Sequence, residues 1–411
     1  MPVTKALKWT GLAGPEQAPV AVVGLGHAGV HWIAAVFYLV LPFITEDLGL
    51  SYAQAGALVA VFHATSVVIN IASGFLVDVT GRRVLWQTVA LIAGALGLAG
   101  FALTRDYTVL ALLVALIAAS NNLWHPAAIS WLSRRYPANR GYVLSVHALG
   151  ANLGDALAPL AAGALLAVMA WGPAAALAAL PVGAVAWVLW RTLASRRTGA
   201  AGDHQQVSLA GYFGGMVKVV RDRAVLGLAL MAGFRTMAQS GLLAFLPLYL
   251  ANDLGLSPLA MGAALAAMQA GGVIAGPAAG VLSDRIGRRR IVIAGLGLST
   301  VVILALALAG RPVLFVAGVT VLGFVMYAIR PVIHSWMMDI TPANLGGSAT
   351  SLLFGVQAGL SALAPLIGGL LADAFGLVTV FWFLAAAMLV SNLIALRLPP
   401  DHTPTSAQEA S

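Results

Sequence analysis

The feature that most constrains this chain is a series of twelve long apolar segments. A helix crosses the hydrocarbon core of a bilayer with about 20 apolar residues. Segments of this kind, bounded by charge, Gly, Pro and turn signals, lie at 20–43, 52–77, 84–103, 108–132, 141–169, 172–193, 224–250, 258–283, 290–309, 312–337, 345–372 and 376–397. Only 9% of the 411 residues are charged and 60% are hydrophobic, too little charge to cover a water-soluble fold of this length. The sequence predicts an all-α integral membrane protein with 12 transmembrane helices.

One long hydrophilic stretch divides the twelve segments into two groups of six. We expect an N-terminal six-helix bundle over residues 1–193 and a C-terminal six-helix bundle with a short tail over 224–411. Residues 194–223 between them form a basic cytoplasmic linker with an amphipathic piece on the membrane surface. The remaining loops are short, which excludes a large extramembrane domain.

The basic residues predict the orientation of the chain. With a cytoplasmic N-terminus, 18 of the 22 Lys and Arg residues fall on the cytoplasmic side and two fall outside. Cytoplasmic loops of membrane proteins carry an excess of Lys and Arg. This distribution predicts a multi-pass protein of the cytoplasmic (inner) membrane with both termini in the cytoplasm. The N-terminal residues lack the apolar core of a signal peptide, so the first apolar segment is read as a retained span.

The two halves also repeat each other at an offset of 205 or 206 residues. Asp47-Leu-Gly-Leu-Ser51 returns as Asp253-Leu-Gly-Leu-Ser257, and His125-Pro126 corresponds to Arg330-Pro331. An offset of six spans gives both halves the same orientation, which is a parallel repeat.

These features resemble the major facilitator superfamily (MFS) of secondary transporters. Its loop motif G-x-L-x-D-R-x-G-R-R/K is matched by two copies, with Val79 in place of the usual Arg in the first. The motif residues are Gly74, Asp78, Gly81, Arg82 and Arg83, and then Gly280, Asp284, Arg285, Gly287 and Arg288. His27, Trp124-His125-Pro126 and Asn152-Leu-Gly154 are similar to the fosmidomycin-resistance group, although His31 stands where that group tends to have an acid.

The resemblance implies the MFS fold, in which two six-helix bundles related by pseudo-two-fold symmetry rock about a central cavity. It also implies export of a small molecule, a monomer in the bilayer, and a gating role for the two loop motifs. In this hypothesis Asp78 and Asp284 pair across the bundles or accept helix N–H groups.

The C-terminal half offers fixed positive charge within its spans. An ionised side chain at mid-bilayer costs about 2.5–3.5 kcal/mol on insertion scales, so each one requires a reason. Arg330 in the tenth segment, with His334 four residues on, is suited to a carboxylate, phosphate or phosphonate. The alternative is an ion pair of Arg330 with Asp339. Arg235 is either deep in the cavity or directed toward the interface, and Gln239 lies one turn beyond it.

The N-terminal half offers groups that titrate or form hydrogen bonds. Asp155 is the one acid expected within a span; it is either a proton carrier, with His31 as relay, or the ionised partner of an arginine. His27 and His31 share a helix face and line the cavity with Asn121 and His125. The H-x-x-x-H spacing of His27 and His31 could ligate a metal, but no carboxylate or Cys accompanies it within that span. We therefore expect no metal site.

Several function classes are excluded by the same reading. Gly24-Leu-Gly-His-Ala-Gly29 fits a dinucleotide motif but lacks a surrounding βαβ unit, and no Walker A sequence is present. The basic loops contain acids at fixed spacing, so nucleic acid is not an expected partner. We expect no cofactor, no catalytic residues and no enzyme activity.

The residues and the resemblance together favour an exporter of a small polar or anionic compound, such as an antibiotic, driven by proton antiport. The alternatives are a proton-coupled importer of a small organic anion and a non-transporting membrane receptor.

Overall fold

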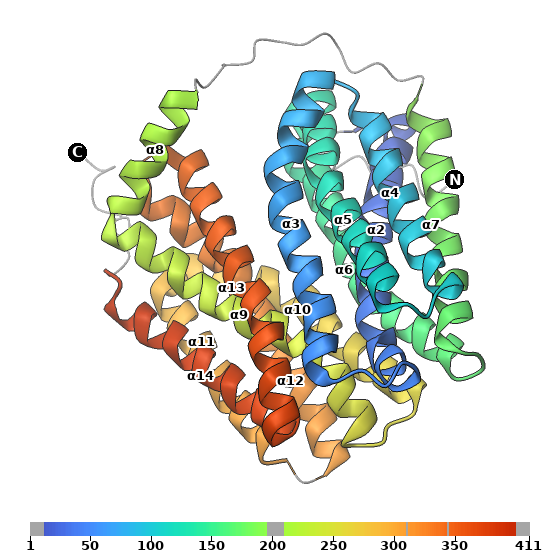
Figure 1. The fold of residues 1–411 in the computed structure, drawn as a ribbon. Coiled ribbons are helices and arrows are strands. Elements are labelled where there is room, and N and C mark those ends of the chain that lie inside the picture. The colour runs from blue at the N-terminus through green and yellow to red at the C-terminus, as the bar shows by residue number, and fades with distance from the viewer. Residues whose placement is uncertain (1–11, 195–208, 310, 343–344, 400–411) are drawn as a thin grey trace. The chain divides into compact units, whose positions relative to one another are not determined.

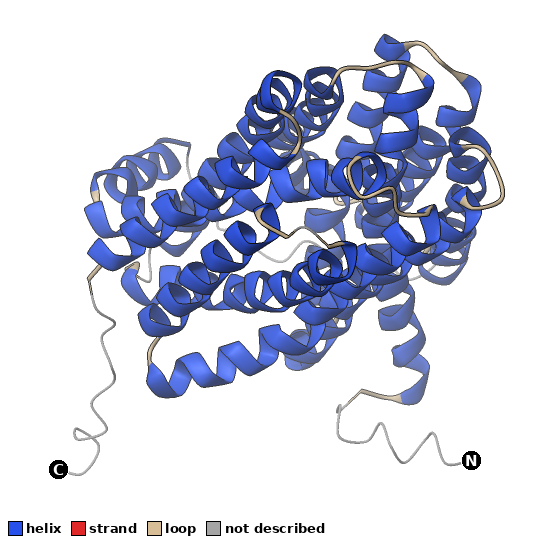
Figure 2. Cartoon of the chain, turned by 90° about the horizontal axis from the view of Figure 1, so that it is seen from below, coloured by secondary structure: helices blue, strands red, loops and turns tan. Residues whose placement is uncertain are grey.

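The computed structural model describes residues 12–194, 209–309, 311–342 and 345–399. Over these ranges Figure 2 shows helices and loops without a strand. Long helices occupy the places of all twelve apolar segments: α2 (Gly14–Asp47), α3 (Tyr52–Thr80), α4 (Arg83–Gly100), α5 (Tyr107–Arg135), α6 (Arg140–Leu166), α7 (Trp171–Leu193), α9 (Arg223–Asn252), α10 (Pro258–Ile286), α11 (Arg288–Ala307), α12 (Pro312–Ile340), α13 (Gly346–Phe375) and α14 (Val378–Arg397).

The predicted all-α membrane architecture is confirmed. Eleven of the described helices are long and apolar enough to cross a membrane, and α9, with 30 residues, takes the place of the seventh span. Residues 195–208 of the predicted basic linker lie outside the described residues. Its described part contains the helix α8 (Leu209–Arg221), which ends with Lys218 and Arg221 in its last turn.

Local signals explain where these helices begin and end. Ser51 and Gln54 form a reciprocal capping box at the start of α3, and Gly81 in the left-handed conformation ends it. Asp106 caps α5 by accepting from the amide of Val109. α2 begins six residues before its apolar segment, because Pro15 fits the first helical turn.

The chain divides into two compact units. Unit 1 comprises residues 1–204 and 243–269, and unit 2 comprises residues 205–242 and 270–411. The boundary between the units therefore crosses α9 and α10. Within unit 1, the first part of α10 packs on α6, since a Cβ at Gly163 would press against the backbone of Pro258.

In unit 1, helix α2 lies against α4, α5, α6 and α7, as Figure 1 shows. Its contact with α6 is a backbone contact. A Cβ at Gly150 would overlap the carbonyl oxygen of Gly24, and a Cβ at Gly154 would overlap that of Ala28. Only glycine fits at these two positions, so the two helices approach closely over two turns.

In unit 2, helix α11 packs against α12 and α14, and α13 packs against α14 and α8. The glycines of α13 that correspond to Gly150 and Gly154 at an offset of 205 are Gly355 and Gly359, and a Cβ at either would meet no atom within 4 Å. The repeated glycines therefore have different packing in the two units.

The start of α2 is fixed by a polar contact to the segment between α5 and α6. The Tyr136 hydroxyl donates to Glu16 Oε2 at 2.7 Å, and Arg135 donates to Glu16 Oε1 at 3.3 Å. Burial and the nearby Glu16 carboxylate raise the pKa of Tyr136 to about 12. The phenol therefore keeps its proton and remains a donor at neutral pH.

Candidate functional site

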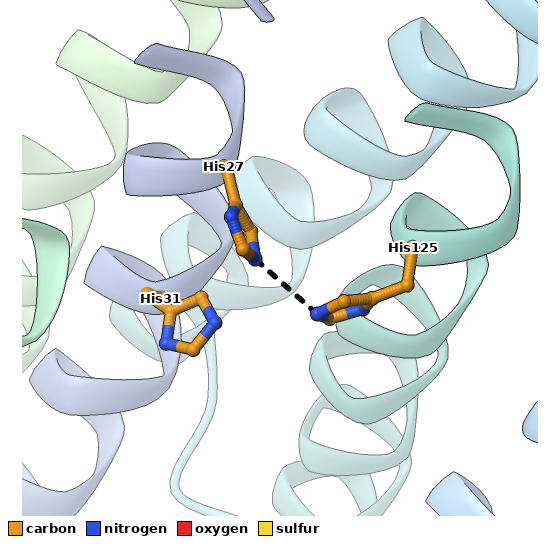
Figure 3. A group of neighbouring side chains, drawn as sticks. All are labelled: His27, His31 and His125. Atoms are coloured by element: carbon orange, nitrogen blue, oxygen red, sulfur yellow. Dashed lines mark hydrogen bonds between the residues drawn. The ribbon is translucent and has the colours of Figure 1, made fainter. Parts of the chain in front are cut away.

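Three histidines of unit 1 meet within the helix bundle and are called here the histidine cluster: His27 and His31 from α2, and His125 from α5. Figure 3 shows the three rings turned toward one another. The Nε2 atoms of His27 and His125 are 3.3 Å apart. One ring nitrogen from each of the three residues lies within 4.8 Å of the others. His27 is buried, whereas His31 and His125 are partly exposed.

The opposite ring nitrogens are bound to oxygen acceptors. His27 Nδ1 lies 2.6 Å from the carbonyl oxygen of His147, and His125 Nδ1 lies 2.8 Å from that of Asn121. A carbonyl oxygen only accepts, so both Nδ1 atoms carry hydrogen. In a neutral imidazole the other nitrogen then holds a lone pair. Two Nε2 lone pairs face each other at 3.3 Å, and a shared cation between them removes their repulsion.

Asp155 of α6 holds the third ring. His31 Nδ1 lies 3.0 Å from both carboxylate oxygens of Asp155, and the two side chains are 21% and 26% exposed. The sequence left open whether Asp155 pairs with an arginine; its partner in the structure is His31. The close approach of α2 and α6 at Gly154, one residue before Asp155, makes this contact possible.

His147 and Trp124, which are not among the predicted site residues, support the histidine cluster. The His147 ring stacks on His27 with centroids 3.7 Å apart. Trp124 Nε1 donates to His147 Nε2 at 3.2 Å, so that nitrogen is an acceptor and is already used. The sequence pointed to Trp124 only through its position directly before His125.

Asn121, the remaining predicted binding residue of unit 1, lies one turn before His125 on α5. Its side-chain amide donates to the backbone carbonyl oxygen of Val30 at 3.4 Å, and its backbone carbonyl oxygen accepts from His125 Nδ1. Asn121 therefore links α5 to α2 beside the cluster.

Unit 2 contains a second polar group, called here the arginine pair: Arg235 on α9 and Arg330 on α12. Arg235 is 3% exposed and donates to the carbonyl oxygen of Met326 at 2.6 Å. Its Nε is buried without a hydrogen-bond partner among the described residues. The two guanidinium groups lie close enough for their charges to repel each other, and His334 lies in the same positive environment.

Carboxylates are missing from the surroundings of the arginine pair in the described part of the chain. The alternative partner considered for Arg330 was Asp339, but Asp339 binds Arg288, with Nε to Oδ2 at 3.2 Å. The view that Arg235 extends toward the interface is also not what the structure shows, because the side chain is fully enclosed. Gln239 lies one turn further along α9 and is partly exposed.

The first loop motif joins α3 to α4 around Gly81, whose φ of 65° is in the left-handed region. Arg83 is buried and donates to Ser130 at 3.1 Å, and it lies 3.9 Å from Asp78. Arg82 and Asp78 are exposed, and Gly74 has open space around it.

The second loop motif joins α10 to α11 around Gly287, with a φ of 100°. Arg288 bridges Asp284 and Asp339 and also donates to Ser283 at 2.6 Å. Arg285 is exposed and Gly280 has open space around it. The second motif is therefore a network of four side chains, whereas in the first motif Arg83 binds Ser130 and lies at the limit of ion-pair distance from Asp78.

Twelve long helices in two sequence repeats of six, with polar clusters inside apolar helices, define a multi-pass membrane protein. The family model of the Major Facilitator Superfamily matches residues 23–236 and 228–411. The chain belongs to this superfamily, and its twelve-helix MFS fold follows. Transporters of this superfamily bind small-molecule substrates.

Comparison with known proteins agrees with this assignment. The chain is 24% identical to a fosmidomycin resistance protein of Escherichia coli (strain K12), over 98% of this chain and 97% of that protein. It is 23% identical to an MFS-type transporter of Bacillus subtilis (strain 168), over 93% and 92% of the two chains. The fold is similar to that of a bacterial homologue of the human lysosomal transporter Spinster, with a TM-score of 0.82, 16% identity, and coverage of 94% and 97%.

Proposed function

We propose that this protein exports a small polar or anionic compound across the cytoplasmic membrane by proton antiport with alternating access. The observation that carries the proposal is the arginine pair: two cations of unit 2 close to each other, one of them enclosed, with no carboxylate within ion-pair distance in the described residues.

An unpaired buried charge is expensive, because desolvation is not repaid by a partner. An anionic ligand supplies that partner, and a guanidinium offers a planar fork that matches carboxylate, phosphate or phosphonate. We assign Arg235 and Arg330 to the charged part of the substrate, with Gln239 and His334 beside them. Within unit 1, we propose His27, His31, Asn121 and His125 as polar substrate-binding residues.

The proposed coupling ion is the proton, and its proposed carriers are Asp155 and His31. Their side chains are 3.0 Å apart and about one quarter exposed, so the pair can exchange a proton while remaining inside the bundle. The buried Arg235 cannot take this role, because a guanidinium does not release its proton in practice.

The direction of transport is proposed from the named relative. The E. coli protein similar to this chain over nearly its whole length is called a fosmidomycin resistance protein, and resistance by a transporter is consistent with export. We further propose that the protein is a monomer. Both termini are assigned to the cytoplasm, as the distribution of basic residues predicts.

The substrate class is tested by thermal unfolding of the purified protein in detergent with phosphonates, carboxylates, sugars and hydrophobic cations. A ligand at a hundred times its dissociation constant stabilises by about 2.7 kcal/mol. We expect an anion to raise the unfolding midpoint of the wild type and to have no effect on Arg330→Ala. Stabilisation by cations or neutral compounds that survives in Arg330→Ala contradicts the anion assignment.

Direction and coupling are tested in everted membrane vesicles, where export appears as uptake. We expect an acidic vesicle interior to drive accumulation of the stabilising anion and a protonophore to abolish it. Accumulation in right-side-out vesicles with an acidic exterior would instead identify a proton-coupled importer, and binding without flux would identify a receptor.

A further inference from the structure

We propose that the histidine cluster is a binding site for one divalent transition-metal ion of the zinc class, with His27, His31 and His125 as its three protein ligands. This inference does not depend on the proposed export, and in it the three histidines meet a substrate through the metal rather than directly.

The distance between His27 Nε2 and His125 Nε2 fits two ligands of one zinc ion. Zinc binds histidine nitrogen at about 2.0–2.1 Å in tetrahedral geometry, which places two ligand nitrogens about 3.3–3.4 Å apart. The Nε2 atoms of His27 and His125 are 3.3 Å apart. The third nitrogen lies within 4.8 Å of both, so the His31 ring must move inward by about 1.4 Å to complete the tetrahedral face.

The ring nitrogen that does not face the proposed metal, Nδ1, is bound to an oxygen atom in all three histidines. A metal-bound histidine almost always donates its second N–H to a carboxylate, a backbone carbonyl or water, which fixes the tautomer and the ring orientation. His27 donates to a carbonyl at 2.6 Å, His125 donates to a carbonyl at 2.8 Å, and His31 faces the Asp155 carboxylate at 3.0 Å. The outer shell of a three-histidine metal site is therefore present for all three ligands.

One side of the histidine cluster is open, and its ligand atoms are of the type that zinc prefers. His27 forms the buried side of the cluster, while His31 and His125 are partly exposed, which leaves one side of the site accessible. Three protein ligands with an open fourth position are the arrangement of zinc sites that exchange a water or ligand. Imidazole ligands suit zinc, copper, nickel and cobalt, whereas magnesium and calcium prefer oxygen ligands.

The sequence predicted no metal site because the span that contains His27 and His31 has no carboxylate or Cys beside them. The third histidine comes from α5, 98 residues after His27, and the carboxylate comes from α6, 124 residues after His31. Asp155 lies in the outer shell and orients a ligand rather than binding the metal. The spacing rule for ligands within one segment could not detect this arrangement.

The test is direct metal binding to the full-length protein, purified in detergent through a tag without histidine and stripped with a chelator. Zinc is titrated against a chromogenic chelator, and stoichiometry is measured by elemental analysis after desalting. We expect one zinc per chain in the wild type and loss of this binding in His125→Ala. Asp155→Asn should weaken zinc affinity about 10- to 100-fold, the usual effect of removing an outer-shell partner.

Two variants with the same substitution control for loss of histidine in general. His63→Ala removes a histidine of α3 that contacts Tyr38, and His334→Ala removes one from unit 2. Both should bind one zinc with wild-type affinity. Gel filtration and tryptophan fluorescence establish that each variant is folded, and the conservative Asp155→Asn serves if His125→Ala does not fold.

Cobalt substitution gives an independent readout of geometry. A four-coordinate cobalt site should give intense visible absorption in the wild type and none in His125→Ala. No zinc binding to the wild type, or binding that is unchanged in both cluster variants, overturns the proposal and leaves a proton as the cation between His27 and His125. These measurements involve no transport, so failure of the proposed export would not affect them.

Discussion

The same place in the repeat carries opposite chemistry in the two units. His125-Pro126 on α5 corresponds to Arg330-Pro331 on α12. Around His125 the structure gathers two further imidazoles, with the Nε2 atoms of His27 and His125 3.3 Å apart and with Asp155 bound to His31. Around Arg330 it gathers a second guanidinium without a carboxylate in the described residues. The two units therefore differ in the ligand that we propose for each: a cation for the histidine cluster and an anion for the arginine pair.

The helix packing differs in a parallel way. Gly150 and Gly154 of α6 are pressed against the α2 backbone, whereas Gly355 and Gly359 of α13 have open space. At an offset of 205 residues, Asp155 corresponds to Leu360. The close contact in unit 1 thus accompanies the carboxylate that it positions, and the corresponding described positions of α13 have neither.

The largest expected effect comes from breaking the close contact. Gly150→Leu places a side chain into the carbonyl of Gly24 and should destabilise the protein by more than about 3 kcal/mol, or prevent folding, because a backbone cannot yield as a side chain does. At the matched position Gly355 an added Cβ meets no described atom within 4 Å, and glycine is a poor helix former, so Gly355→Leu should cost far less than Gly150→Leu. Thermal unfolding of both variants measures the difference, and equal destabilisation would contradict it.

The next effect concerns the enclosed guanidinium. Arg235→Met keeps much of the side-chain volume and removes the unpaired charge, so the ligand-free protein should unfold at a higher temperature. The stabilisation by the anionic ligand, about 2.7 kcal/mol at a hundred times its dissociation constant, should vanish. A variant that is less stable without ligand and still responds to it would show that Arg235 is structural.

A smaller effect on stability is expected at Asp155. Asp155→Asn weakens a partly exposed contact with His31 and should cost about 1 kcal/mol, less than a fully buried charged hydrogen bond. Its effect on transport should be greater than its effect on stability. Accumulation driven by a pH gradient is lost, while exchange of labelled for unlabelled substrate continues. Asp373→Asn, at the exposed end of α13, is the control with the same substitution. Retained gradient-driven accumulation in Asp155→Asn would exclude it as a proton carrier.

The smallest effect is expected at the loop motifs. Asp78 and Asp284 are mostly exposed, so replacing either with Asn should change stability by less than about 1 kcal/mol. The change at Asp284 should be the larger, because Arg288 joins it to a wider network. Both variants should bind ligand normally and transport it more slowly. Wild-type turnover in both would contradict the gating hypothesis.

The sequence predicted the fold well because each span carries its own signal. Long apolar runs, capping residues such as Ser51 and terminating glycines such as Gly81 are local, and the structure places helices at all twelve segments. The site residues were named for the same reason: a polar side chain within an apolar run is conspicuous.

Their partners could not be predicted, because these depend on how helices cross. His27 and His31 were placed on one face by their spacing, but their convergence with His125 requires the packing of α2 on α5. The choice of His31 over an arginine as partner of Asp155 depends on the contact of α6 with α2. The role of the His147 carbonyl has no side-chain signal at all.

The distance along the chain between these groups also sets the order in which the site is built. The rings of α2 enter the membrane first, and His125 follows in the fourth span. The acceptors for His27 and His31, the His147 carbonyl and the Asp155 carboxylate, arrive only with the fifth span. A chain arrested during synthesis before α6 therefore holds three histidines but not the two acceptors that orient His27 and His31.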